Sequence, residues 1–112
     1  EGKHCGAGSM NVAVDPYGNV YACVAWRVAA GNLHEKPIRE IWETSGVLPT
    51  IREGTVAAHK MIAAEGADGK FMAFCPGLAV EMTGRPDQAT DLQRERARIV
   101  KESYDKAHEP PA

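Results

Sequence analysis

The sequence has no long apolar run and no excess of one charge. None of its apolar stretches approaches the ~20 residues needed to cross a bilayer, and its N-terminal EGKHCGAG lacks the apolar region of a signal peptide. The net charge of -2 comes from 13 basic and 15 acidic side chains without a long like-charged run. This balance gives no electrostatic reason to expect binding to nucleic acid or to a membrane surface. We therefore expect a cytoplasmic protein.

Cysteine is scarce as well, with only Cys5, Cys23 and Cys75. An odd number without features of secretion argues against a disulfide framework and leaves buried free thiols, catalysis or metal binding. Ser-His-Asp, paired-carboxylate, phosphate-loop and His-Glu-x-x-His patterns are absent too. The 112 residues suit a single domain. Because the chain begins without methionine and directly on a motif, we expect it to be a piece of a longer protein.

The first quarter of the chain predicts a β-hairpin. Residues 10–15, MNVAVD, alternate in the manner of a strand, PYGN at 16–19 has the composition of a turn, and VYACVAW at 20–26 resumes a β-branched and aromatic run. We expect an antiparallel hairpin over about residues 10–24. Such a hairpin folds Cys5, in the loop before the first strand, back toward Cys23, near the end of the second.

The periodicity becomes helical at Pro37, after an irregular connection. Thr55 is a plausible N-cap, Cys75 precedes a proline suited to a first helical turn, and Thr90 with Gln93 forms a capping box. The predicted fold class is α+β, a small antiparallel β-hairpin followed by short helices and a longer C-terminal helix. The expected helices cover about 37–44, 55–65, 76–83 and 90–107, with a loop or short strand leading to Cys75.

The C-terminal helix has a narrow apolar stripe in a strongly charged sequence. We expect it to dock loosely here and to find its main partner elsewhere. The predicted organisation is therefore a domain over 1–86, followed by a C-terminal helix and tail over 87–112. The stripe consists of Leu92, Ile99, Val100 and Tyr104.

The three cysteines would be delivered by a loop, a strand end and a helix N-terminus. At Cys75 the helix dipole favours a thiolate, which suits a metal ligand or a reactive thiol. Structural zinc sites usually show closely spaced cysteine pairs and four ligands, whereas no two cysteines here are closer than 18 residues. Three thiolates could equally hold one iron-sulfur cluster. Spacing alone leaves zinc and iron-sulfur both open.

Three segments between residues 4 and 86 follow one another in a characteristic order. Cys5, Gly18 and Cys23 stand in the spacing C-x12-G-x4-C, and the later segments are GNLHEKPIREIW and FCPGLAVEMTG. Together they resemble the SPASM and twitch domains found at the C-terminus of radical S-adenosylmethionine enzymes. The resemblance implies an auxiliary [4Fe-4S] domain beside a separate radical S-adenosylmethionine barrel, in enzymes that modify a peptide or protein.

The chain departs from the full SPASM pattern in its later cysteines. GADG stands where a C-x2-C pair would fall, and Ala79 occupies the cysteine position after Cys75. The resemblance therefore implies one [4Fe-4S] cluster held by Cys5, Cys23 and Cys75, as in the one-cluster twitch variant. The position matched by Cys75 serves the second cluster in full SPASM domains, so Cys5 and Cys23 are the firmer ligands.

A fourth ligand is open among His34, His59, Asp68 and an exogenous group. We expect His4 to reach the same cluster only with difficulty, because it is adjacent to Cys5 in the chain.

The sequence lacks the C-x3-C-x2-C motif that binds the catalytic cluster and S-adenosylmethionine, so we expect no catalysis by this chain alone. The implied partners are the barrel, in the same longer chain or another subunit, and a peptide or protein substrate; the implied role is electron transfer, substrate positioning or both. The alternative is a cluster-free or zinc-holding module that binds a peptide at a strand edge.

Overall fold

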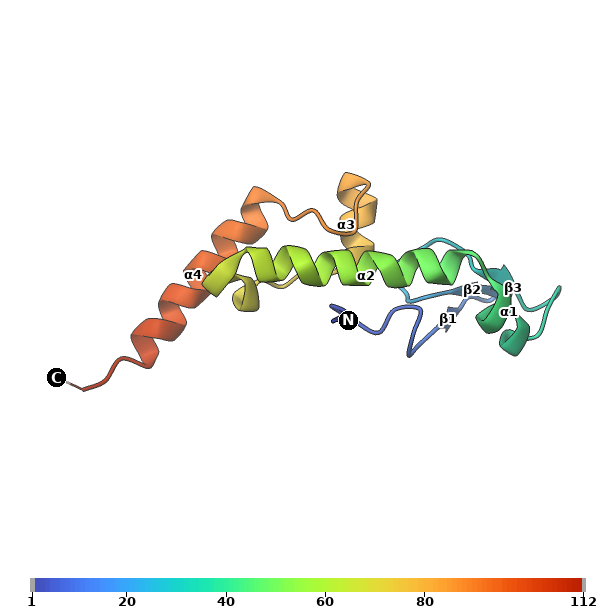
Figure 1. Ribbon diagram of the computed structural model, residues 1–112, viewed down its shortest axis with the longest axis horizontal. Helices are drawn as coiled ribbons and strands as arrows, with labels where there is room; N and C mark the ends of the chain where they lie inside the picture. Colours follow the sequence, from blue (N-terminus) through green and yellow to red (C-terminus); the bar gives the residue numbers. More distant parts are fainter. Residues whose placement is uncertain (1, 112) are drawn as a thin grey trace.

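One long helix sets the shape of the molecule. The computed structural model describes residues 2–111, and its extents are 65 × 25 × 24 Å. Helix α2 (Val47–Ala64) runs along much of the longest axis. A small sheet and helix α1 (Ile38–Thr44) lie at one end of α2, and helix α4 (Asp91–Ala107) lies at the other (Figure 1). Within residues 2–111, no helix is long and apolar enough to cross a membrane.

The sheet has three short antiparallel strands in the order β1-β2-β3. Strand β1 (Ala13–Val14) pairs with β2 (Asn19–Tyr21), which also pairs with β3 (Gly31–Asn32). The predicted hairpin and the α+β class are confirmed, although the paired residues cover less than 10–24. Strand β3 was not expected, because its two residues read as irregular connection. Its glycine is required, since a Cβ on Gly31 would lie 2.9 Å from the Ile41 side chain.

The turn between β1 and β2 is organised by the carboxylate of Asp15. It accepts hydrogen bonds from the backbone N–H groups of Tyr17 (2.9 Å) and Asn19 (3.0 Å), from the Asn19 amide (3.0 Å) and from the Tyr21 hydroxyl (3.1 Å). Gly18 has a φ of 85°, which a residue with a side chain rarely adopts. The turn is therefore specified by local side chains, as its sequence predicts.

The start of helix α2 differs from the start predicted from the sequence. A helix was expected over about 55–65 with Thr55 as its N-cap, but α2 begins at Val47 and contains both Pro49 and Thr55. Pro49 lies in the first turn, where backbone N–H groups have no intrahelical acceptor and a proline is tolerated. Thr55 is fully buried inside the helix, and its hydroxyl donates to the Arg52 carbonyl at 2.7 Å.

The segment after α2 forms a 3-10 helix, η1 (Gly66–Phe71), rather than the expected loop or short strand. It is followed by α3 (Pro76–Thr83), which matches its predicted limits and ends at Gly84 with a φ of 82°. The predicted capping box of α4 is confirmed, because Gln93 N–H donates to Thr90 Oγ1 at 3.2 Å and Thr90 N–H donates to Gln93 Oε1 at 2.7 Å.

Two buried clusters lie along α2. The first core joins the N-terminal loop, the strand β2 segment and the first half of α2; the second core joins the end of α2, the segment before α3, α3 itself and α4. Trp26 and Ile41 are buried, whereas Ile38 is 42% exposed. The first core contains Ala7, Ala22, Trp26, Leu48 and Ile51, and the second contains Ala58, Met72, Phe74, Ala79, Ala89 and Ala97.

Helix α4 docks through a different surface from its predicted stripe. Leu92, Ile99, Val100 and Tyr104 are each about half exposed, while Ala97 is buried in the second core. Tyr104 still contacts the Phe71 ring, with centroids 5.3 Å apart. The helix is therefore held against η1 and the second core, with an Arg94–Glu65 ion pair at 2.8 Å, while most of its apolar stripe is exposed to solvent.

Candidate functional site

All three cysteines line one cavity of about 320 Å³. None of them forms a disulfide; Cys5 is exposed, and Cys23 and Cys75 are half-buried. The thiols come from three segments far apart in the sequence, so the cavity exists only because the fold brings these segments together. Its other lining residues are His4, Gly6, Ala7, Asn11, Val24, Ala25, Phe74 and Pro76.

The loop that carries Cys5 is tied to its surroundings on both sides. The backbone N–H of His4 donates to the Thr55 carbonyl of α2 at 3.0 Å, and the Arg52 guanidinium donates to the Gly8 carbonyl at 2.5 Å. The Asn11 amide donates to the carbonyl of Ala22, the residue before Cys23, at 2.9 Å. These bonds hold the loop of Cys5 against α2 and against the backbone beside Cys23.

Cys75 reaches the cavity through the packing of α3. A Cβ on Gly77 would lie 2.9 Å from the Ala25 carbonyl carbon and 2.9 Å from the Trp26 nitrogen. The first turn of α3 therefore lies directly against the backbone that follows Cys23, at a separation that only glycine permits. Cys75 is the N-cap of this helix, and its side chain makes no capping hydrogen bond. Its sulfur is thus not committed to the helix.

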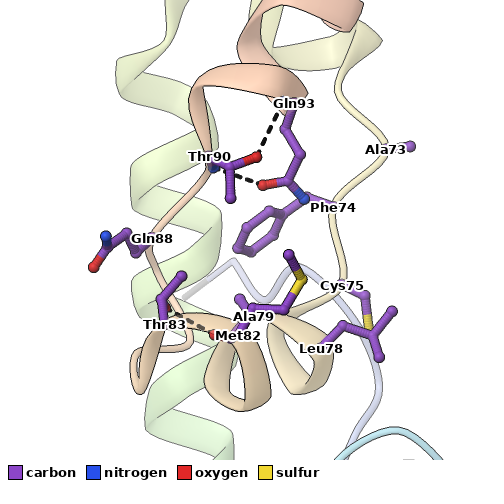
Figure 2. Close-up of a pocket in the computed structure, with 10 residues that line it drawn as sticks. All are labelled: Ala73, Phe74, Cys75, Leu78, Ala79, Met82, Thr83, Gln88, Thr90 and Gln93. Carbon is purple, nitrogen blue, oxygen red and sulfur yellow. Dashed lines mark hydrogen bonds between the residues drawn. The ribbon is translucent and has the colours of Figure 1, made fainter.

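A second cavity, of about 450 Å³, adjoins the first along the Phe74–Cys75 segment. Figure 2 shows the Phe74 ring between Gln93 and Met82, with Cys75 beside Leu78 at its edge. Phe74 and Cys75 line both cavities. The segment before α3 therefore forms part of the wall of both cavities, and Phe74 makes that wall apolar.

The three residues considered as a fourth ligand lie outside the cysteine cavity. His34 is beside the hairpin turn, where a Cβ on Gly18 would approach it to 3.0 Å. His59 is an exposed residue of α2. Asp68 is in η1, facing the charge of Lys101 on α4. His4, which the sequence argued against, lines the cavity instead.

The cysteines do not form a ready-made ligand cluster. Within residues 2–111, no group of three or more His, Cys, Asp or Glu side chains is placed to hold a metal ion. The donor chemistry nevertheless fits an iron-sulfur cluster, because cysteine thiolates are its usual ligands and all three border one space. Because metal binding is coupled to local folding, the three sulfurs would move closer together when a cluster binds.

Comparison with known families identifies part of this site. The model of the SPASM family, an iron-sulfur cluster-binding domain, matches residues 5–64, which is more than half of the chain. The matched region contains Cys5 and Cys23 and ends before Cys75. Neither a curated protein nor a solved structure matches the chain significantly.

Proposed function

Because the chain belongs to the SPASM family of iron-sulfur cluster-binding domains, we propose that it holds one auxiliary [4Fe-4S] cluster on Cys5, Cys23 and Cys75. The observation that carries this proposal is the single cavity bordered by all three thiols. The family match supports the first two ligands, and the close approach of Gly77 to the Ala25–Trp26 backbone supports the third.

Each part of the cavity has a role in this proposal. The three thiolates bind iron, and Cys75 is presented to the cavity at the N-terminus of α3. Buried Ala7 and Phe74 exclude water from one side, while exposed Cys5 leaves the other side open to a docked partner. A bound cluster supplies one-electron transfer, at a potential set by burial and by hydrogen bonds to the sulfurs.

We place this domain in a radical S-adenosylmethionine enzyme that modifies a peptide or protein in the cytoplasm. The chain has no C-x3-C-x2-C motif, so radical formation belongs to a barrel in the same longer chain or in another subunit. The cluster domain then transfers electrons, positions the substrate or does both.

The proposed division into 1–86 and 87–112 has its own test. Most of the apolar stripe of α4 is exposed, and only Ala97 on the helix is buried. We expect truncation after residue 88 to leave iron binding intact and to lower the unfolding midpoint only slightly. Loss of the folded state on truncation would make α4 an integral part of the cluster domain.

Anaerobic reconstitution of the full chain tests the function directly. We expect brown protein with about four irons per chain, the content of one [4Fe-4S] cluster, and a sharp loss of iron in each of Cys5→Ala, Cys23→Ala and Cys75→Ala. Colourless protein with stoichiometric zinc would contradict the proposal. Full iron content in Cys75→Ala alone would remove Cys75 from the ligand set.

A further inference from the structure

Three thiolates leave one iron of a four-iron cluster without a protein ligand. Among the residues that border the cysteine cavity, only His4 and Asn11 bring a further side-chain nitrogen or oxygen. The Asn11 amide nitrogen already donates to the Ala22 carbonyl. Its remaining atom is an amide oxygen, a donor that suits hard cations, whereas imidazole suits iron. His4 is therefore the chemically suitable side chain on the cavity wall.

The hydrogen bond of His4 determines which ring nitrogen is available. Nε2 lies 2.7 Å from the Phe74 carbonyl oxygen, and a carbonyl can only accept, so Nε2 carries the proton. In the neutral ring the lone pair is then on Nδ1. Histidines that bind metals almost always donate their other ring N–H to a group of this kind. The contact also fixes the ring, which packs edge-on against Phe74 with centroids 5.7 Å apart.

Adjacency to Cys5 does not prevent both residues from lining the cavity. The backbone bends at His4 and Cys5 instead of continuing as an extended strand, and both border the same space. His4 is held at two points, through its backbone N–H on Thr55 (3.0 Å) and its imidazole on Phe74. We propose that His4 Nδ1 is the fourth ligand of the cluster, an inference that rests on the proposed function.

Pulsed electron paramagnetic resonance on the reduced, reconstituted full chain tests this ligand. Protein made with ¹⁵N-histidine should show a nitrogen coupling that differs from that of unlabelled protein, because a histidine nitrogen is bonded to iron. His4→Ala should abolish the histidine coupling, whereas His34→Ala and His59→Ala, with rings outside the cavity, should retain it. His4→Cys should keep about four irons per chain and lose the coupling, which covers the case in which His4→Ala fails to hold the cluster.

The possible failures are distinguishable. A parent protein with four irons whose spectrum is unchanged by ¹⁵N-histidine would overturn the His4 ligand and leave the proposed function standing. Loss of the coupling in His34→Ala or His59→Ala, with His4→Cys unaffected, would assign the nitrogen to another histidine. A parent that binds no iron would overturn both proposals.

Discussion

The two sides of the cysteine cavity are built by different physical means. Cys5 and Cys23 lie inside the family match. The Asn11 amide bonds the loop of Cys5 to the backbone beside Cys23, and two further hydrogen bonds hold that loop against α2. Cys75 lies outside the match and reaches the cavity only because α3 packs against the backbone after Cys23. The side formed by Cys5 and Cys23, the sheet side, is therefore held mainly by hydrogen bonds, and the side formed by Cys75, the α3 side, is held mainly by close packing. Variants that damage the α3 side should leave the β1–β2 hairpin intact.

Phe74→Ala should cause the largest loss of stability, and it acts on the α3 side of the cavity. Phe74 is 9% exposed, belongs to the second core and contacts the His4 ring, and truncation of a buried phenylalanine costs about 3–5 kcal/mol. Urea unfolding should show this loss, together with reduced iron content. The amide spectrum of residues 13–21 should change little under native conditions.

Leu78→Ala is the matched control, since Leu78 borders the neighbouring cavity but is 49% exposed. We expect its free energy of unfolding to change by less than about 0.5 kcal/mol, as for most surface substitutions. Equal effects of the two variants would show that Phe74 does not anchor the segment before Cys75.

Gly77→Ala should push α3 away from the backbone that follows Cys23, although it removes no side chain. The new Cβ would meet backbone atoms of Ala25 and Trp26, which cannot rotate away. Forcing such a contact typically costs about 1–3 kcal/mol, and displacement of α3 should carry Cys75 away from Cys23. Denaturant unfolding and iron content measure both effects.

Gly46→Ala provides the comparison, because a Cβ there meets nothing within 4 Å and its φ is -75°. This variant should load iron as the parent does. If Gly77→Ala were equally stable and equally loaded, the close approach of α3 to the strand segment would not be required for the site.

Asn11→Ala tests the sheet side by removing the bond to the Ala22 carbonyl. Loss of one such hydrogen bond costs on the order of 1 kcal/mol, so the variant should fold with a modestly lower unfolding midpoint. The loop carrying Cys5 should exchange its amide hydrogens faster, while α3 keeps its protection. Met10→Ala, at an 86% exposed position in the same loop, should leave amide exchange unchanged. If Asn11→Ala and Met10→Ala behaved alike, the hydrogen bond from Asn11 to Ala22 would not be what holds the loop.

The sequence was most informative where structure depends on neighbouring residues. The turn at residues 16–19 and the capping box at Thr90 act over a few positions, and the sequence predicts both correctly. Features that depend on distant residues were missed. Gly31 of strand β3 packs closely against Ile41, and a Cβ on Gly69 of η1 would collide with the Ile62 carbonyl oxygen.

The candidate site divides in the same way. The predicted hairpin turns Cys5 back toward Cys23, but the hydrogen bonds that fix the loop of Cys5 come partly from α2. The position of the His4 ring depends on the Phe74 carbonyl, 70 positions away. No local pattern marks that hydrogen bond. Gly77 had a faint signal, since the C-x-G spacing after Cys75 is part of the family resemblance, but its contact with Ala25 appears only in three dimensions.

The smallest expected effect is a pH dependence confined to the sheet side. Burial acts to raise the pKa of Asp15, but hydrogen bonds from Asn19, Tyr17 and Tyr21 together lower it below its ordinary value. A lowered folded-state pKa contributes stability above the unfolded value of about 3.9, and this stability is lost as pH falls through the folded pKa. The β1–β2 amides should therefore lose exchange protection in this acid range, and Asp15→Asn should weaken that dependence.

Asp87→Asn is the matched control on the α3 side. Two hydrogen bonds from the Arg85 guanidinium, both 3.0 Å, lower the pKa of Asp87, so this carboxylate titrates in the same direction but lies between α3 and α4. Residue-resolved exchange should show Asp87→Asn leaving the acid response of the hairpin unchanged. If instead both variants altered the hairpin equally, the acid response would belong to the whole fold, and the two sides of the cavity would be more tightly coupled than their separate construction implies.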